Sequence, residues 1–277
     1  MELKKAIKKQ VKLRLGMSAV SGGGKTYSSL LMAYGMTNDW NKIAVIDTEN
    51  DSASLYADLG DYNTISLQAP YTPERYIECI KACENANMDV IIIDSITHEW
   101  DGKGGILEIS NSMTGNSFTN WAKLTPRHQA FIDAILQSKC HIITTVRRKQ
   151  DYEMTKDQNG KIQVQKAGLK EVTREGFEYE LTVNFELDTK HNVSVSKDRT
   201  GLFMGKPDFI ITPEIGKIII DWCNNGVNEI ELLKSKIKEC KNEEELNTLY
   251  KNNKSIANTE EIINLLKKQK ESWKQQA

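Results

Sequence analysis

A glycine-rich segment directly after an apolar run constrains the fold more than any other part of the sequence. Residues 11–17 indicate a β-strand, residues 19–26 (AVSGGGKT) follow at once, and residues 27–35 have the composition of a helix. Glycines let backbone N–H groups curl around phosphate oxygens, and the positive end of the following helix adds to this attraction. The order of strand, glycine-rich turn and helix therefore predicts a nucleotide-binding P-loop.

The chemistry of the P-loop gives its last residues specific roles. Lys25 would reach the β- and γ-phosphates of ATP, and the hydroxyl of Thr26 would ligate Mg²⁺. Ala19 stands where the strict motif has its first glycine. An accidental glycine-rich turn is the alternative, but chance matches with a strand before and a helix after are rare. The predicted nucleotide-binding residues of the loop are Ser21, Gly22, Gly23, Gly24, Lys25, Thr26 and Tyr27.

Asp94 closes an apolar run, residues 90–93, of the kind that forms a buried strand. An aspartate in this place is the Walker B residue of P-loop ATPases, where its carboxylate holds the Mg²⁺ shell. The alternative is an aspartate that only caps the end of a strand. Because a P-loop lies upstream, we predict that Asp94 and Thr26 hold one Mg²⁺ ion.

Hydrolysis also needs a carboxylate that orients or deprotonates the attacking water. Glu49 follows the apolar run at residues 43–46, which places it at the carboxyl edge of a strand, where ligands bind in open α/β sheets. Glu99 lies a few residues beyond Asp94, also where a strand ends. We favour Glu49, keep Glu99 as a second candidate, and take a solvated loop carboxylate as the alternative for each.

Apolar runs rich in β-branched residues alternate with helical segments, which predicts βαβ units. Some runs are almost continuously apolar, as in central strands covered on both faces. The predicted class is therefore α/β, a P-loop core with a mainly parallel central sheet; its resemblance to RecA-like proteins rests on the order of its motifs. The predicted strands are residues 11–17, 42–47, 89–94, 141–146, 181–187 and 192–197, the last two as a hairpin that extends the sheet.

Helices and two long connections complete this core. A helix is predicted after Thr26, and two more at residues 72–85 and 125–138, the last with Pro126 in its first turn. The connections are residues 102–120 and residues 151–178. The second contains Asn159-Gly160 between alternating residues, which predicts a β-hairpin.

Composition sets the remaining bounds. After residue 226 the chain becomes rich in Lys, Glu, Asn and Leu at helical spacing, which predicts an ATPase domain at residues 1–226 and a small helical appendage at residues 227–277. The net charge of -1 means that any nucleic-acid contact needs a local basic surface. The five cysteines form no CxxC pair, and no apolar run approaches the roughly 20 residues of a membrane span. We expect a cytoplasmic protein without a membrane contact.

The order of these motifs is similar to that of the RecA superfamily: P-loop, strand ending near Glu49, Walker B strand ending at Asp94, and a strand with a polar end. The resemblance covers residues 13–223 and does not extend to the tail. Three segments more closely resemble the phage AAA-type ATPases that include core-only RecA-like single-strand-annealing proteins. They are residues 94–100 (DSITHEW), 126–131 (PRHQAF) and 197–201 (KDRTG).

The resemblance implies roles for further residues. Glu49 matches the catalytic glutamate of RecA-type proteins by its position after the second strand. Thr145 or Arg147 matches a position that senses the γ-phosphate, where the RecA family more often has Gln. Lys197 and Arg199 resemble basic residues that reach a neighbouring subunit's nucleotide and neutralise transition-state charge. A solvated strand end is the alternative for these two.

The resemblance also implies a DNA surface, because the two loops after the Walker B and sensor strands face DNA in RecA-like assemblies. The second loop carries basic residues, which neutralise phosphates, and aromatic residues, which stack on unpaired bases. Acidic residues lie among them, so a solvated hairpin of mixed charge is the alternative.

The leading hypothesis is an ATP-dependent recombination or annealing protein that acts on single-stranded DNA as a homo-oligomeric ring or filament. If it is phage-encoded, its location is the host cytoplasm. The C-terminal helices would recruit a single-strand-binding protein or another replication protein. The alternative is a nucleotide-switched interaction module with little turnover and no direct DNA role, whose activity would survive a change at Glu49. A small-molecule kinase is disfavoured because we find no clear arginine-rich lid segment.

Overall fold

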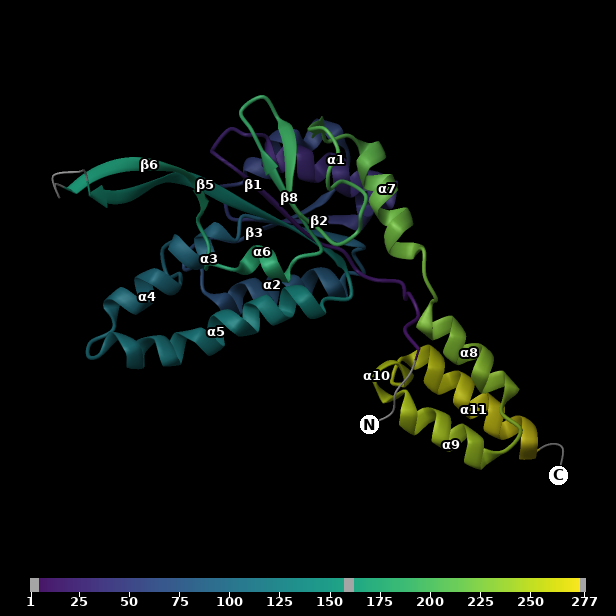
Figure 1. Cartoon of the computed structure of the whole chain (residues 1–277). Coiled ribbons are helices and arrows are strands. Elements are labelled where there is room, and N and C mark those ends of the chain that lie inside the picture. The colour runs from purple at the N-terminus through teal and green to yellow at the C-terminus, as the bar shows by residue number, and fades with distance from the viewer. Residues whose placement is uncertain (1–4, 157–161, 275–277) are drawn as a thin grey trace. The chain divides into compact units, whose positions relative to one another are not determined.

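One sheet organises the larger part of the chain. In the computed structural model, which describes residues 5–156 and 162–274, nine strands join this sheet (Figure 1). The strands are β1 (Arg14–Ala19), β2 (Ile43–Asp47), β3 (Asn63–Ser66), β4 (Val90–Asp94), β5 (His141–Lys156), β6 (Ile162–Glu171), β7 (Val183–Leu187), β8 (Asn192–Asp198) and β9 (Phe209–Ile210).

The sheet is mainly parallel, as the alternation of strands and helices predicts. Its order is β3-β2-β4-β5-β1-β7-β8-β9, with β6 paired to β5. The pairs from β3 through β7 are parallel, and β8, β9 and β6 are antiparallel to their neighbours. β1 lies between β5 and β7, so the P-loop that follows it emerges in the middle of the sheet, at the carboxyl edge where ligands bind.

Helices cover both faces of the sheet. The helices of this part are α1 (Lys25–Thr37), α2 (Pro73–Asn85), α3 (Thr97–Asp101), α4 (Ile106–Ser112), α5 (Ser117–Gln137), α6 (Phe177–Glu180) and α7 (Pro213–Asn224), with 3-10 turns at Trp40–Lys42 and Ser52–Leu59. α2 and α5 lie on one face, and α1 and α7 lie on the other (Figure 1). Burial on both faces explains why the central strands are almost wholly apolar.

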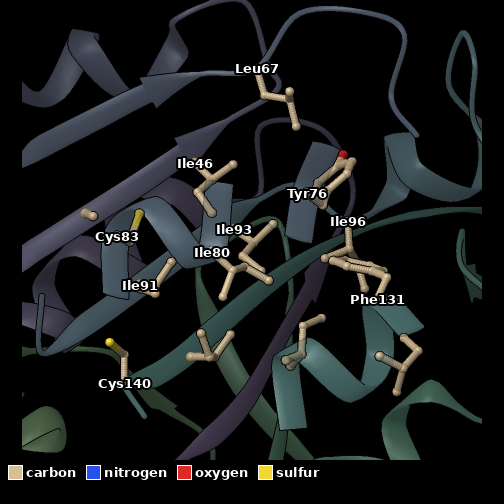
Figure 2. Packing of buried hydrophobic residues seen from close by; sticks show 14 of the residues in the cluster. Ile46, Leu67, Tyr76, Ile80, Cys83, Ile91, Ile93, Ile96, Phe131 and Cys140 are labelled. Atoms are coloured by element: carbon tan, nitrogen blue, oxygen red, sulfur yellow. The ribbon is translucent and has the colours of Figure 1, made fainter. Parts of the chain in front are cut away.

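The core under α2 and α5 shows the alternation expected of strands. Ile91 and Ile93 of β4 point to this face and pack with Tyr76 of α2 and Phe131 of α5, whose ring centroids lie 5.1 Å apart (Figure 2). On the other face, α1 and α7 approach closely at a glycine. A Cβ added at Gly35 would lie 1.8 Å from the carbonyl oxygen of Pro213, so only glycine fits there.

The structure corrects the predicted loop at residues 102–120 and the start of the following helix. α4 lies within that segment, and α5 begins at Ser117, where Asn116 caps it by accepting a hydrogen bond from the N–H of Phe118 at 2.8 Å. Pro126 therefore lies inside α5 and not in its first turn. The prediction was wrong because proline is most common in the first turn of a helix, whereas here the cap lies well upstream.

The predicted hairpin in the second connection is present. β5 continues beyond the central sheet and pairs antiparallel with β6 from Arg148↔Glu171 to Lys156↔Ile162. The predicted turn at Asn159-Gly160 lies outside the described residues.

Two strands were not predicted, β3 and β9; both are short and include exposed residues, so they lack the apolar runs of the central strands.

The chain forms two compact units, Lys12–Trp222 and a second that joins Met1–Val11 to Cys223–Ala277. The second unit contains α8 (Glu229–Glu239), α9 (Glu243–Asn252), α10 (Lys254–Ala257) and α11 (Glu260–Lys274). Its own core includes Leu233, Ile237, Leu246 and Ile262. The sequence predicts a division after residue 226, whereas this grouping begins the second unit at Cys223 and joins the N-terminal segment to it. The N–H of Val11 donates to the carbonyl of Cys223 at 3.1 Å.

Among residues 5–156 and 162–274, no helix combines the length and the apolar composition that a bilayer crossing requires.

Candidate active site

The P-loop, residues 19–26, connects β1 to α1. Gly22 and Gly24 have left-handed backbones, with φ angles of 78° and 80°, which glycine adopts without strain. Ala19 is fully buried, and a side chain on Gly23 would place its Cβ 2.6 Å from the Cβ of Ala19. An alanine is therefore compatible with the first position of the motif, because the glycine opposite it has no side chain.

The ammonium group of Lys25 lies within the P-loop. The residue is 8% exposed, and its Nζ donates to the carbonyl oxygens of Ala19 and Val20, both at 3.3 Å. Burial lowers the pKa of Lys25, the carboxylate of Asp94 opposes this shift, and the guanidinium of Arg147 adds to it. Lys25, Asp94 and Arg147 therefore share one electrostatic environment.

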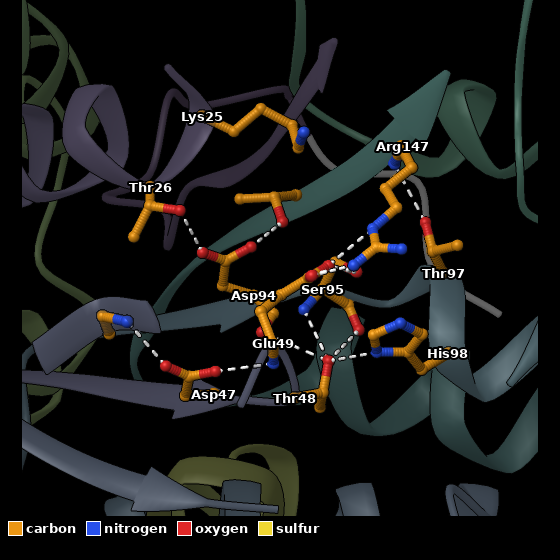
Figure 3. Close-up of polar contacts among 12 residues, drawn as sticks. Lys25, Thr26, Asp47, Thr48, Glu49, Asp94, Ser95, Thr97, His98 and Arg147 are labelled. Carbon is orange, nitrogen blue, oxygen red and sulfur yellow. Dashed lines mark hydrogen bonds and ion pairs between the residues drawn. The ribbon is translucent and has the colours of Figure 1, made fainter. Parts of the chain in front are cut away.

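Asp94 joins two hydroxyl groups from different elements. Oγ1 of Thr26 donates to Oδ2 of Asp94 at 2.5 Å, and Oγ1 of Thr145 donates to Oδ1 at 2.6 Å (Figure 3). A hydroxyl and a carboxylate side by side fit Mg²⁺, which usually takes one or two protein oxygens and completes its shell with phosphates and water. The structure thus brings together the two predicted Mg²⁺ ligands, and places the predicted γ-phosphate sensor Thr145 against one of them.

Glu49 is placed by the turn after β2. Both oxygens of Asp47 accept backbone hydrogen bonds, from the N–H of Glu49 at 2.6 Å and from the N–H of Ala53 at 2.7 Å (Figure 3). The N–H of Thr48 donates to the carbonyl of Asp94 at 2.7 Å. The ends of β2 and β4 are therefore tied together, and Glu49 follows directly from this junction.

The carboxylate of Glu49 is held by two side chains. Nε of Arg147 donates to Oε1 at 2.8 Å, and Nη2 of Arg147 contacts Oε2. Oγ of Ser95, the residue after Asp94, donates to Oε1 at 3.1 Å (Figure 3). Glu49 thus lies next to the Asp94 region, as the sequence predicts for a catalytic carboxylate, but in this structure it is paired with an arginine.

Glu99, the second candidate, lies in a different environment. It is 1% exposed, and its two oxygens lie 3.0 and 3.1 Å from Nδ1 of His128. Burial raises the pKa of Glu99, and the hydrogen bond to His128 opposes that shift. Trp100 packs against the same histidine, with ring centroids 5.4 Å apart. Of the two candidates, Glu49 is therefore the one that contacts the residue next to Asp94, whereas Glu99 is buried against His128.

Lys197 and Arg199 do not join the P-loop residues. Nζ of Lys197 donates to the carbonyl of Glu178 at 3.1 Å, and Nη2 of Arg199 donates to the carbonyl of Tyr179 at 3.1 Å. Both side chains therefore lie against α6, within the same chain. Contact of Lys197 and Arg199 with the nucleotide of a neighbouring subunit therefore stays a prediction.

A pocket of about 390 Å³ lies beside the P-loop. Tyr27, a predicted nucleotide-binding residue, lies on it with its ring 5.7 Å from that of Tyr56, while Ser21 is exposed and does not line it. His191 lies over Gly24, since a Cβ added there would be 2.6 Å from its Nδ1. The lining residues are Gly22, Gly24, Lys25, Thr26, Tyr27, Ser28, Tyr56, His191, Ile210 and Ile211.

Sequence reasoning missed part of this pocket. Tyr56, His191, Ile210 and Ile211 come from three separate segments of the chain, and none belongs to a motif. Two of them are aromatic rings and two are isoleucines, so this side of the pocket is suited to the nucleoside end of a nucleotide whose phosphates lie in the P-loop.

One comparison with known proteins assigns the larger part of the chain to a family. Residues 12–210, which contain the P-loop, Glu49 and Asp94, match the family model of the AAA domain. No curated protein matches the chain. Among solved structures, a KaiC-like protein from the hyperthermophilic archaeon Pyrococcus horikoshii OT3 is 14% identical, with coverage of 72% of this chain and 85% of that chain and a TM-score of 0.39. The fold of this chain is an α/β sheet with a P-loop between β1 and α1. Because the family model spans more than half of the chain, the chain belongs to the AAA domain family.

Proposed function

We propose that this chain hydrolyses ATP, with Mg²⁺ held by Thr26 and Asp94. The observation that carries the proposal is the meeting of Lys25, Thr26, Asp94 and Glu49 at the carboxyl ends of β1, β4 and β2, which lie in one mainly parallel sheet. Lys25 binds the β- and γ-phosphates, and bound Mg²⁺ would offset the charge that develops on them. Glu49 accepts the proton of the water that attacks the γ-phosphorus, while the bond to the bridging oxygen of ADP breaks.

Phosphate release and equilibrium ATP binding, measured on the same variants, test this proposal. Lys25→Ala is expected to lose both, whereas Glu49→Gln is expected to keep binding and lose at least about 100-fold in turnover, since a general base contributes about that much. Glu78→Gln, an exposed change on α2, is the matched control. If Glu49→Gln binds ATP and retains its cellular activity, the nucleotide-switched interaction module is the better description.

For the activator of this ATPase we propose single-stranded DNA, in a recombination or annealing reaction. A groove of about 400 Å³ between the end of α3 and the β5–β6 hairpin carries Trp100, Lys149 and Lys170 among its lining residues. An indole next to lysines suits an unpaired base and its phosphate. Acidic residues also line the groove, and Asp101 pairs with Lys149 at 2.9 Å, so DNA must displace this ion pair.

Fluorescence anisotropy with a labelled oligothymidylate at two salt concentrations tests the DNA proposal. Lys149→Ala and Lys170→Ala are each expected to weaken binding and to reduce the salt slope by about one. Lys217→Ala, an exposed lysine on α7, should leave both unchanged. DNA that neither binds nor stimulates ATP turnover would rule the proposal out.

We also propose that the chain works as a ring or filament, in which Lys197 and Arg199 serve the nucleotide of the next subunit. Mixing Arg199→Ala with Lys25→Ala subunits should restore part of the turnover that each variant lacks alone, because some sites then combine intact halves. Absence of any recovery in assembled mixtures would contradict this role.

For α8–α11 we propose recruitment of a single-strand-binding or other replication protein. Deletion of residues 227–277 that leaves every such interaction intact would exclude it.

A further inference from the structure

Arg147 lies between the P-loop and the candidate catalytic carboxylate. It pairs in register with Ala19, the last residue of β1, so it is next to the start of the P-loop. Its N–H donates to Oγ1 of Thr97 at 2.9 Å, and its carbonyl accepts from the N–H of Val172 at 2.8 Å. The backbone of Arg147 is therefore held by hydrogen bonds, while its side chain is 37% exposed.

The guanidinium of Arg147 forms an ion pair with both carboxylate oxygens of Glu49. Each oxygen of Glu49 meets a different nitrogen of Arg147, and Oε1 also accepts from Ser95. A general base must be oriented toward the attacking water, and the hydrogen bonds from Arg147 and Ser95 take three of the about four acceptor positions of this carboxylate. In the structure as it stands, Glu49 is therefore placed near the site but engaged elsewhere.

The γ-phosphate of ATP would lie close to Arg147. Nζ of Lys25, which the P-loop motif assigns to the β- and γ-phosphates, donates to the carbonyl of Ala19 at 3.3 Å, and Ala19 pairs in register with Arg147. Guanidinium groups bind phosphate in the same bidentate manner as carboxylate, and the γ-phosphate carries more charge than one carboxylate. The γ-phosphate is thus a competitor for the same arginine.

We propose that Glu49 and the γ-phosphate of ATP compete for Arg147. Without nucleotide, or with ADP, Arg147 holds Glu49 in an unproductive position. ATP draws the guanidinium to its γ-phosphate and frees the carboxylate for water. Arg147 is then a positioning residue that ties the base to the presence of a triphosphate. This inference rests on the proposed ATPase function and adds its control.

The chain provides a matched control one residue along the same strand. Nη1 of Arg148 donates to Oε2 of Glu186 at 2.7 Å, so Arg148 is also in an ion pair with a glutamate. Successive side chains of a strand point to opposite faces, so Arg148 faces away from the side that Arg147 occupies. Its Nη2 donates to the carbonyl of Leu169 at 3.0 Å, and the pocket that it lines is formed by residues of the hairpin, of α6 and the segment before it, of β7 and of β8, and by none of the P-loop.

Equilibrium binding tests the competition without relying on turnover. Dissociation constants for ADP and for a non-hydrolysable ATP analogue would be measured on wild type, Glu49→Gln, Arg147→Ala, Arg147→Lys, Arg148→Ala and the Glu49→Gln/Arg147→Ala double variant, each checked by thermal unfolding. Removing the charge of Glu49 should tighten binding of the analogue by about tenfold and leave ADP binding unchanged, since a competitor of the γ-phosphate has been removed. In the Arg147→Ala background this gain should vanish.

The conservative variant separates this role from a structural one. Arg147→Lys keeps a charge but not the bidentate fork, so it should retain part of the preference for the analogue over ADP, whereas Arg147→Ala should lose it. Arg148→Ala should match wild type with both ligands. A gain that appears with both ligands, or that persists without Arg147, overturns the competition. If the wild type binds neither ligand, the proposed ATPase function itself fails.

Discussion

Thr26, Asp94 and Thr145 come from three separate parts of the chain, yet the oxygens of Asp94 accept hydrogen bonds from both hydroxyls. The residues that a contiguous motif identifies, Lys25 and Thr26, needed only the sequence, because their spacing is fixed by the chemistry of the loop. The choice between Glu49 and Glu99 needed the structure. The burial of Glu99 against His128 depends on α5, which no local pattern around Glu99 reveals.

His141 should make stability depend on pH. Burial lowers its pKa to about 3, helped by the charges of Lys12 and Arg14, and Nδ1 accepts from the N–H of Leu13 at 3.1 Å. Below pH 6.5, the ordinary pKa of histidine, His141 becomes protonated in the unfolded chain but stays neutral in the folded chain. The free energy of unfolding therefore decreases as the pH falls below 6.5. The slope is about 1.4 kcal/mol per pH unit from this group alone.

The matched comparison for this prediction is His141→Asn, whose side-chain oxygen still accepts from Leu13. Urea unfolding at several pH values between about 4 and about 7 should show a shallower decline for the variant, because only the histidine gains the proton. Other titrating groups are shared and cancel in the difference. Parallel curves for the two proteins would show that His141 is not held neutral.

Tyr56 should contribute to nucleotide binding through the pocket beside the P-loop. Tyr56→Ala removes an aromatic wall, so ATP affinity should fall by about tenfold while affinity for inorganic triphosphate, which lacks a base, stays the same. Leu55→Ala is the control, because Leu55 is 79% exposed and does not line the pocket. Calorimetric titration measures the affinity for both ligands. An equal loss of affinity for ATP and for triphosphate in Tyr56→Ala would show that the nucleoside does not bind against Tyr56.

At the level of elements, Arg14 of β1 closes the end of α5. Its guanidinium donates to the carbonyls of Leu136, Ser138 and Cys140, at the last turn of the helix and the connection to β5. A helix leaves its final carbonyls without internal partners, and this buried arginine supplies donors for them. The apolar run around Arg14 predicted the strand β1, but nothing in the sequence near this arginine indicated that its side chain would bind the end of α5.

Arg14→Met should destabilise the fold by about 3 kcal/mol, because buried carbonyls lose their donors. Arg75→Met is the comparison. Arg75 also donates to backbone carbonyls, including that of Pro70 at 2.8 Å, but at an exposed site, so its loss should cost about 0.5 kcal/mol or less. Chemical denaturation gives both values. Similar losses for the two variants would mean that Arg14 has no special role at the end of α5.

At the scale of the whole chain, the two units have separate cores. The α/β class could be predicted because alternating strands and helices depend on local pattern. The grouping of Met1–Val11 with Cys223–Ala277 could not, because it depends on long-range backbone hydrogen bonds, such as that from Gln10 N–H to the carbonyl of Val227 at 3.2 Å. Each core should therefore respond to its own mutations.

Leu246→Ala tests this separation. Leu246 is 1% exposed in the helical core, so its truncation should cost about 2–5 kcal/mol there. Hydrogen exchange should become faster in α8–α11 and stay unchanged in β1 and β4. Leu232→Ala, at a residue that is 40% exposed on α8, should change little in either unit. Faster exchange in both units would show that they unfold together.

The most direct test of the central claim is single-turnover ATP hydrolysis by the purified chain, with Mg²⁺ and with chelator, for wild type and Asp94→Asn. Asp94 meets Thr26 at 2.5 Å, so the account predicts hydrolysis that requires Mg²⁺ in the wild type and is lost by at least about 100-fold in the variant. Asp133→Asn, an exchange on α5 outside the site, should match the wild type. Hydrolysis that persists in Asp94→Asn, or that proceeds equally well with chelator, would contradict the account.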